Sequence, residues 1–172
     1  MFTSPIKNLK AFDLREGDIV ADLGAGTGYY AIAAAHIVTQ GKVYAVELHQ
    51  EFVATIKNKI KEAGVKNIEV LWGNVEKLGG SKLADNVANA VIVSNVLFQI
   101  EDKDGFIKEI KRILKKGGKV LLVDWSEATP FNPKLIVPAE KAKEMFIGSG
   151  FKLERFIDAG AHHYGMILVK GD

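Results

Sequence analysis

Three glycines at alternate positions, Gly24, Gly26 and Gly28, form the part of this sequence with the clearest capacity for chemistry. They follow an apolar run over 18–23 that is typical of a strand buried on both faces, and they precede an alanine-rich segment with helical spacing. Glycine permits backbone conformations that a Cβ forbids, and it lets a ligand approach the main chain closely. The helix that follows presents unpaired N–H groups and the positive end of its dipole. The pattern predicts a ligand-binding loop rather than a plain turn, because each glycine adds to the entropy lost on folding.

The spacing of this loop limits the kind of ligand. A dinucleotide-binding fingerprint needs its third glycine three positions after the second, whereas position 29 here is a tyrosine. Asp22, two positions before the first glycine, would repel a pyrophosphate and suits a ligand with a positive charge or an amine. No Gly-Lys-Ser/Thr follows, which excludes a Walker loop. The residues alone thus indicate a nucleotide-like ligand without a pyrophosphate.

At this loop the chain resembles the first motif of the class I S-adenosylmethionine-dependent methyltransferases; the run reads Asp22-Leu23-Gly24-Ala25-Gly26-Thr27-Gly28. The resemblance covers essentially the whole chain. It implies S-adenosylmethionine as cofactor and S-adenosylhomocysteine as product, bound by Asp22, Gly24, Ala25, Gly26 and Gly28. The stretch 90–125 resembles the ubiquinone/menaquinone-biosynthesis type of small-molecule methyltransferase. That likeness implies a small-molecule acceptor without saying which one.

Further cofactor contacts are expected where the second and third strands end. Glu47 ends the second strand, 19 positions after Gly28, where a carboxylate can accept hydrogen bonds from ribose hydroxyls. The alternative is a solvated acid at a strand end, and in either case we expect the fold to survive its loss. Leu48 is either an adenine contact or a core leucine.

The third strand leads into Gly73, Asn74 and Val75, which are expected at the cofactor. The family resemblance implies that the position of Asn74 accepts a hydrogen bond from the adenine amino group. The family often has aspartate there, and asparagine keeps the carbonyl acceptor but loses the charge. An asparagine in a turn is the alternative.

Three more residues complete the expected cofactor site. Ser94 and Asn95 end the fourth strand and would lie along the methionine arm of the cofactor, unless they are hydrogen-bonding groups of the loop alone. Successive helical residues point about 100° apart, so Tyr29 and Tyr30 cannot face the ligand equally. We expect Tyr29 on the cofactor side, with plain packing as the alternative.

Catalytic groups are expected on the acceptor side of the site. A methyl sulfonium is already activated, so alignment and exclusion of water do most of the work, and a base is needed only if the acceptor must lose a proton. The fifth strand brings Asp124 to the ligand edge of the sheet, and the last hairpin brings His162 and His163 to the same edge. Solvated histidines at a hairpin tip are the alternative. No set of residues suggests a metal site.

The elements that must position these residues alternate along the chain. Strands are expected over 18–23, 42–47, 67–72, 90–95, 119–125, 151–157 and 164–170, and helices over 4–12, 28–39, 50–63, 102–114 and 139–149. Alternation of this kind predicts an α/β fold with a doubly wound, Rossmann-like sheet, while the last two strands must form a hairpin. The resemblance implies seven strands in the order 3-2-1-4-5-7-6 with the last antiparallel, in a single methyltransferase domain over 1–172.

Composition and charge narrow the classes of protein. The net charge of +2 and the three arginines weigh against a dedicated nucleic-acid surface. The chain has no cysteine, so disulfides and thiolate zinc sites are excluded, and no signal peptide or membrane-spanning run is recognised; we expect a cytoplasmic protein. Two other functions stay open at this point: an NAD(P)-dependent oxidoreductase, which the glycine spacing opposes, and a non-catalytic cofactor-binding module.

Overall fold

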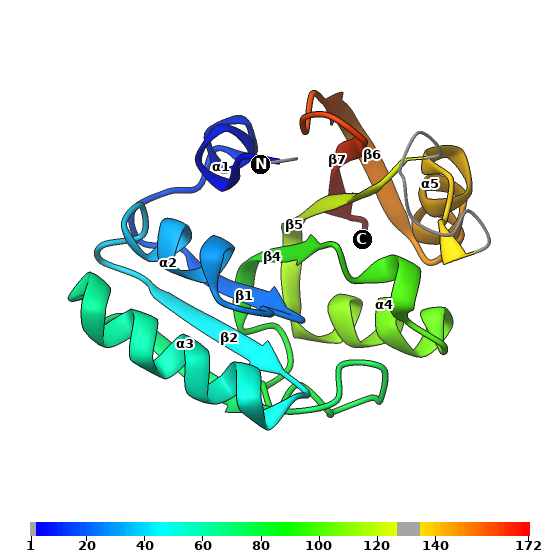
Figure 1. Ribbon diagram of the computed structural model, residues 1–172. Coiled ribbons are helices and arrows are strands. Elements are labelled where there is room, and N and C mark those ends of the chain that lie inside the picture. Colours follow the sequence, from blue (N-terminus) through cyan, green and yellow to red (C-terminus); the bar gives the residue numbers. More distant parts are fainter. Residues whose placement is uncertain (1–2, 127–134) are drawn as a thin grey trace.

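The seven strands form one sheet in the order β3-β2-β1-β4-β5-β7-β6, in a computed structural model that describes residues 3–126 and 135–172 (Figure 1). Neighbouring strands are parallel except β7, which runs antiparallel to both β5 and β6. The predicted order and the antiparallel last strand are confirmed. The strands are β1 Ile19–Leu23, β2 Lys42–Glu47, β3 Ile68–Trp72, β4 Ala88–Ser94, β5 Leu114–Trp125, β6 Phe151–Ile157 and β7 His163–Lys170.

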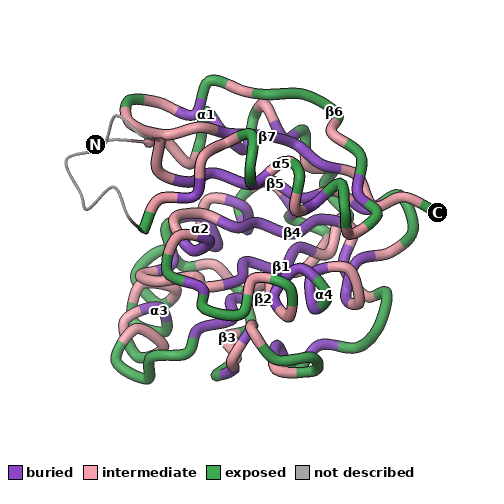
Figure 2. The backbone as a smooth tube through the Cα atoms, turned by 90° about the vertical axis from the view of Figure 1, so that its right-hand side faces the viewer, coloured by how far each residue is buried: buried purple, intermediate pink, exposed green. Residues whose placement is uncertain are grey.

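Helices cover both faces of this sheet (Figure 1). One core packs α1, α2 and α3 on one face, and the other packs α4 and α5 on the opposite face. Alternate residues of a central strand supply the two cores: in β5, Leu121 and Val123 belong to the first and Val120 and Leu122 to the second. The strands therefore form a buried layer between helices (Figure 2). The helices are α1 Pro5–Phe12, α2 Tyr29–Ala35, α3 Gln50–Ala63, the 3-10 helix η1 Leu97–Gln99, α4 Lys103–Ile113 and α5 Ala139–Gly148.

The helix expected over 4–12 is α1, which begins as its sequence suggests. The Ser4 hydroxyl accepts a hydrogen bond from the Lys7 N–H at 3.4 Å, and Pro5 occupies the first turn. Leu9 and Phe12 are buried against α2 and the sheet. The helix thereby brings the residues before it close to the start of α2.

Two glycines lie just outside the predicted bounds of an element, and neither of them ends a helix. The helix predicted over 28–39 is shorter than expected: α2 ends at Ala35, and the φ of Gly41 is not positive. A Cβ on Gly41 would lie 2.0 Å from the Asp18 carbonyl oxygen, so close backbone approach requires glycine there. The strand predicted over 119–125 is longer than expected: β5 begins at Leu114 and therefore includes Gly117. β5 accommodates Gly117 by a shift of its register against β4, and Gly117 has a left-handed φ of 71°.

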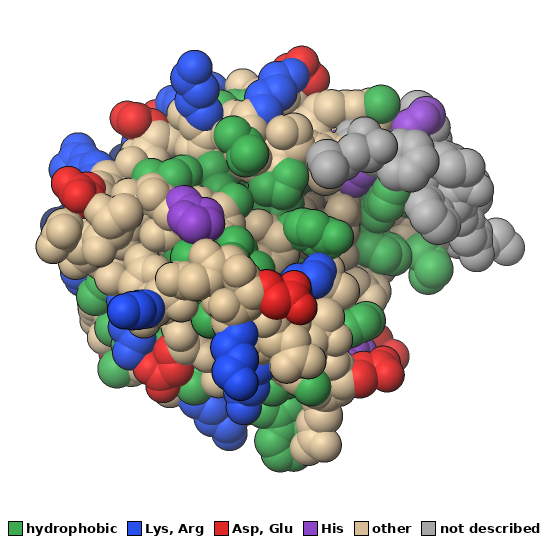
Figure 3. Space-filling view, turned by 60° about the vertical axis from the view of Figure 1, so that its left-hand side comes forward, with side chains coloured by type: hydrophobic (Ala, Val, Ile, Leu, Met, Phe, Trp, Pro, Cys, Tyr) green, Lys and Arg blue, Asp and Glu red, His purple; other side chains and the backbone are tan. Residues whose placement is uncertain are grey.

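Surface features of the described residues bear on possible partners. On the face drawn in Figure 3, Lys and Arg side chains are interspersed with Asp and Glu rather than gathered into one basic patch. Within 3–126 and 135–172, no helix has the length and apolar character needed to cross a bilayer. The sequence also predicts a loop over 126–138, which lies largely outside the described residues.

Candidate functional site

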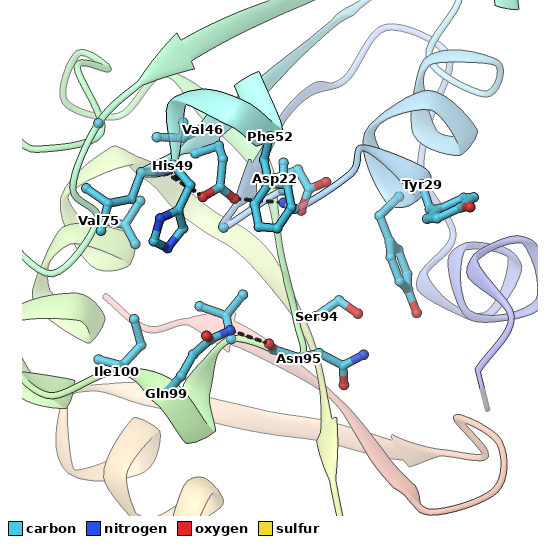
Figure 4. Close-up of a pocket in the computed structure, with 18 of the residues that line it drawn as sticks. Asp22, Tyr29, Val46, His49, Phe52, Val75, Ser94, Asn95, Gln99 and Ile100 are labelled. Carbon is cyan, nitrogen blue, oxygen red and sulfur yellow. Dashed lines mark hydrogen bonds between the residues drawn. The ribbon is translucent and has the colours of Figure 1, made fainter. Parts of the chain in front are cut away.

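A cavity of about 730 Å³ opens beyond the carboxyl ends of β1, β2 and β4. The strand order reverses between β1 and β4, and open α/β sheets bind ligands at such a point. Figure 4 shows Asp22 at β1, Ser94 and Asn95 at the end of β4, and Tyr29 at the start of α2 around the same space. The cavity is lined by twelve of the residues predicted at the cofactor: Asp22, Gly24, Ala25, Gly26, Tyr29, Glu47, Leu48, Gly73, Asn74, Val75, Ser94 and Asn95.

The alternate glycines take left-handed conformations, each in a different setting. Gly24 has φ 73°, and a Cβ on it would lie 2.5 Å from a methyl carbon of Val96. Gly28 has φ 85°, caps α2 and faces Ile56, so it shapes the loop without lining the cavity. Gly26 has φ 57°, and a Cβ on it would meet nothing within 4 Å. Only Gly26 thus combines a place on the cavity wall with open space where a side chain would begin.

The Glu47 carboxylate binds this glycine loop to the end of β2. One oxygen accepts a hydrogen bond from the Gly26 N–H at 2.8 Å, and the other accepts from the Leu48 and His49 N–H groups at 2.8 and 2.9 Å. The residue is only 5% exposed. Three backbone donors would lose their acceptor with Glu47, so its loss should cost stability, while survival of the fold stays a prediction.

Asp22 places a carboxyl group with unused hydrogen-bonding capacity at the cavity. Its side chain is 2% exposed, and its Oδ2 atom has no hydrogen-bond partner. Burial raises the pKa of Asp22 to about 7; the Ala31 N–H lowers the pKa and the charge of Glu47 raises it. The site therefore offers a buried acceptor to a ligand group that brings a donor or a positive charge.

This raised pKa predicts a pH-dependent stability that Asp22→Asn removes. The unfolded pKa of aspartate is near 3.9, so between about pH 4 and 7 the folded wild type holds a proton at Asp22 that the unfolded chain has lost. The wild type should thus lose stability relative to Asp22→Asn as pH rises through this window, by up to about 1.4 kcal/mol per pH unit. Denaturant unfolding of both proteins at pH 4.5, 6 and 7.5 measures this difference. A difference independent of pH would contradict the prediction.

The loop after β3 is held by its own side chains. The Asn74 Oδ1 accepts a hydrogen bond from the Glu76 N–H at 3.0 Å, so this oxygen already serves the turn. The Trp72 indole N–H donates to the Leu48 carbonyl at 2.7 Å and fixes the backbone beside the cavity. The Leu48 side chain itself is exposed, which disagrees with a core leucine. Asn74 and Leu48 therefore line the cavity from backbone segments that these hydrogen bonds hold in place.

The opposite wall contains His163 in a defined orientation. Its Nδ1 lies 2.9 Å from the Ala161 carbonyl oxygen and its Nε2 lies 2.9 Å from the Asn95 side-chain oxygen. Its ring centroid is 4.1 Å from that of Trp125. Burial lowers the pKa of His163, which the Ala161 carbonyl partly offsets and the charge of His162 reinforces. A neutral imidazole that donates from Nδ1 must accept at Nε2, which requires the Asn95 amide to present its nitrogen.

Asp124 and His162, also expected at the acceptor side, do not line the cavity. Asp124 is 1% exposed, and its carboxylate accepts from the Trp125 N–H at 2.7 Å. Burial raises the pKa of Asp124 to about 6, although the N–H groups of Trp125 and of residues 96–98 lower it. Successive strand residues face opposite sides, so Trp125 and its partner His163 reach the cavity while Asp124 lies beneath η1. The expectation that Asp124 rims the cavity is wrong.

Several lining residues had no predicted role. Tyr30 is one of them: it is buried, whereas Tyr29, which was predicted at the cofactor, is 65% exposed, and the Tyr30 hydroxyl accepts a hydrogen bond from the Asn8 amide at 2.8 Å. The Gln99 amide donates to the Asn95 carbonyl at 3.0 Å. Position just after a strand end is the signal that could have found His49, whereas Gln99 lies in η1, five positions after β4 ends. The other lining residues without a predicted role are Thr3, Pro5, Val46, Phe52, Glu76, Val96 and Ile100. No group of three or more His, Asp or Glu side chains in the described part of the chain could hold a metal ion.

Comparison with known proteins identifies the family. A family model described as a methyltransferase domain matches residues 14–158, and the chain belongs to this family. A crystal structure of a SAM-dependent methyltransferase from Aquifex aeolicus is 26% identical, with a TM-score of 0.89, and the match covers 98% of this chain and 90% of that one. The fold is thus the Rossmann-like fold of methyltransferases.

Curated relatives match over a shorter part of their length. The ubiquinone/menaquinone biosynthesis C-methyltransferase of Haemophilus ducreyi is 32% identical over 116 residues, which are 66% of this chain and 44% of the relative. A demethylmenaquinone methyltransferase of Bacillus mycoides is 29% identical over 124 residues, 72% of this chain and 51% of the relative. The chain spans about half the length of the curated relatives it matches.

Proposed function

We propose that this chain is an S-adenosylmethionine-dependent methyltransferase that methylates a small-molecule acceptor and releases S-adenosylhomocysteine. The observation that carries the proposal is the cavity at the strand-order reversal, where Asp22, Gly26 and Glu47 lie on one wall. Family membership and the resemblance of the Aquifex aeolicus methyltransferase support it. A cytoplasmic location, expected from the composition, stays a prediction.

The residues present fit this cofactor. The unpartnered Asp22 oxygen suits the ammonium group of the methionine moiety, and Glu47 is placed to accept from ribose hydroxyls. The open space at Gly26 lets a ligand lie against the backbone. Leu48 and Val75 offer apolar surface to the adenine. When bound, the cofactor would supply a methyl group already activated on a sulfonium.

The chain's own contribution is to bind, orient and exclude water. Ser94, Asn95 and Tyr29 line the part of the cavity between the glycine loop and His163. Because its pKa is lowered, His163 is neutral at pH 7, and its Nε2 can take a proton from an acceptor hydroxyl, amine or carbon acid that displaces the Asn95 side chain. A small acceptor is supported by the printed names of the quinone-biosynthesis relatives and by the volume of about 730 Å³, which is typical of small-molecule sites.

Titration calorimetry and a labelling experiment test this function. The chain should bind S-adenosylmethionine and S-adenosylhomocysteine better than NAD or ATP. Binding of NAD without a response to either sulfur nucleoside would favour an oxidoreductase and contradict the proposal. Incubation with methyl-labelled cofactor and a cell extract should then label an acceptor. Affinity for the cofactor without S-adenosylhomocysteine formation would indicate a non-catalytic binding module.

Neighbouring histidines provide a matched test of proton transfer. His163→Ala should leave the Kd for S-adenosylhomocysteine within about threefold and lower turnover roughly 10²–10⁴-fold, the usual contribution of general acid–base catalysis. His162→Ala, at a residue that does not line the cavity, should keep wild-type turnover. The measurement is turnover of the labelled acceptor across pH 6–9. Full activity of His163→Ala would remove this residue from the catalytic machinery.

A further inference from the structure

Outside the cavity, the most heavily engaged charged group of the described residues is Glu109 on α4. Its side chain is 0% exposed and accepts five hydrogen bonds. One oxygen accepts from the Gly79 N–H at 2.7 Å and the Arg112 Nε at 2.8 Å. The other accepts from the Ser81 N–H at 3.1 Å, the Ser81 hydroxyl at 2.5 Å and the Arg112 Nη2 at 2.7 Å.

These partners keep Glu109 ionised although it is buried. Burial opposes ionisation, but the hydrogen bonds from Arg112, Ser81 and Gly79 outweigh it and lower the pKa of Glu109 to about 2. Arg112 is held in turn by Asp85, at 2.6 Å. A buried carboxylate with all its partners in place is a rigid anchor, because moving any of them would leave a charge unpaired.

Glu109 anchors the loop that follows β3, residues 73–81, which we call the Gly73–Ser81 loop. The two ends of this loop touch: a Cβ on Gly73 would lie 2.2 Å from the Gly80 carbonyl oxygen, and a Cβ on Gly80 would lie 1.8 Å from the Asn74 carbonyl oxygen. A displacement at Gly79 or Ser81 is therefore transmitted to the start of the loop. That start is part of the cavity wall, formed by Gly73, Asn74, Val75 and Glu76.

The same helix also holds the middle of the loop. The Glu76 carboxylate accepts a hydrogen bond from the Asp102 N–H at 3.0 Å, at the N-cap of α4. A Cβ on Gly105 would lie 2.4 Å from the Glu76 carbonyl oxygen, so helix and loop are in close backbone contact. The first turn of α4 holds the cavity side of the loop, and Glu109, two turns later, holds its far end.

We propose that Glu109 is a positioning residue for the adenine end of the cofactor-binding cavity, acting through the Gly73–Ser81 loop. The proposal rests on the proposed function, in which Val75 of this loop offers apolar surface to adenine. Glu109 and Ser81 do not line the cavity, so any effect of theirs on the ligand passes through the loop. Loss of the anchor should weaken binding and reduce the discrimination of adenine from related bases.

Glu109→Gln tests this inference because it keeps the shape of the side chain and replaces one acceptor oxygen with a donor. The Kd for S-adenosylhomocysteine, measured by calorimetry, should rise at least about tenfold, which is 1.4 kcal/mol. The preference over the analogue with hypoxanthine in place of adenine should shrink. The matched control is Ile110→Val, at the next residue of α4, which is buried and apolar. It should lower the Tm without changing either Kd.

Each outcome decides the proposal. A wild-type Kd for Glu109→Gln, or an equal rise in Glu109→Gln and Ile110→Val, would show that Glu109 serves stability alone. If Glu109→Gln does not fold, Ser81→Ala, which removes the hydroxyl's hydrogen bonds with Glu109 and Arg112, should raise the Kd about threefold, and an unchanged Kd would overturn the proposal. A wild-type protein that binds neither sulfur nucleoside would instead refute the proposed function, and this inference with it.

Discussion

Glu47→Ala should raise the Kd for S-adenosylhomocysteine at least about a hundredfold and lower the free energy of unfolding. The variant takes a charge-assisted acceptor from the ligand, where such hydrogen bonds contribute about 1.5–3 kcal/mol each. It also leaves the N–H groups of Gly26, Leu48 and His49 without their acceptor. Each such donor that stays buried and unsatisfied costs about 1–3 kcal/mol, so the glycine loop should loosen as well. Calorimetry gives the affinity and urea unfolding gives the stability.

An isosteric variant and an exposed carboxylate serve as controls for this result. Glu47→Gln keeps one acceptor oxygen and should fall between the wild type and Glu47→Ala in both measurements. Glu51→Ala removes the same charge from an exposed position in the first turn of α3 and should leave the Kd within about twofold. A wild-type affinity for Glu47→Ala would place the ribose elsewhere.

The sequence could predict where Glu47 lies but not what it binds. An apolar run that ends in an acid predicts a strand end, and parallel strands share one ligand edge, so local pattern and topology suffice for the position. The bond to Gly26 joins residues 21 positions apart and depends on how two loops pack. The role of Glu109 could not be predicted for the same reason. Its place on a helix with an apolar face does not indicate that it binds a loop about thirty residues earlier in the chain.

The hydrophobic pattern of a sequence also does not predict which way a side chain points at the end of a strand. Asp124 and Trp125 both reach the carboxyl edge of β5, and nothing in their order says which one faces the cavity. The answer depends on η1, whose N–H groups surround the Asp124 carboxylate. Similarly, the rule that neighbouring helical residues point apart is sound, yet Tyr29 and Tyr30 both line the cavity because it extends around the start of α2.

Gly26→Ala should separate ligand binding from folding more cleanly than a change at either neighbouring glycine. At Gly24 an added Cβ would lie 2.5 Å from Val96, and at Gly28 3.2 Å from Ile56, so those variants disturb the fold itself. At Gly26 the Cβ meets nothing within 4 Å, and only the left-handed φ of 57° is unfavourable, at roughly 1–2 kcal/mol. The ligand-free variant should therefore fold. With ligand, the same Cβ occupies space at the cavity wall, and overpacking of about 1–3 kcal/mol corresponds to a rise in Kd of roughly 10–100-fold.

Gly64→Ala is the matched control for Gly26→Ala. Gly64 ends α3 with φ 66°, and a Cβ on it also meets nothing within 4 Å, so the backbone penalty is nearly the same. It does not line the cavity. Urea unfolding should show similar losses of stability in the two variants, while calorimetry with S-adenosylhomocysteine should show weaker binding only in Gly26→Ala. Equal affinities would mean that the ligand does not approach the backbone at Gly26, and parallel losses of affinity would mean that backbone strain alone weakens binding.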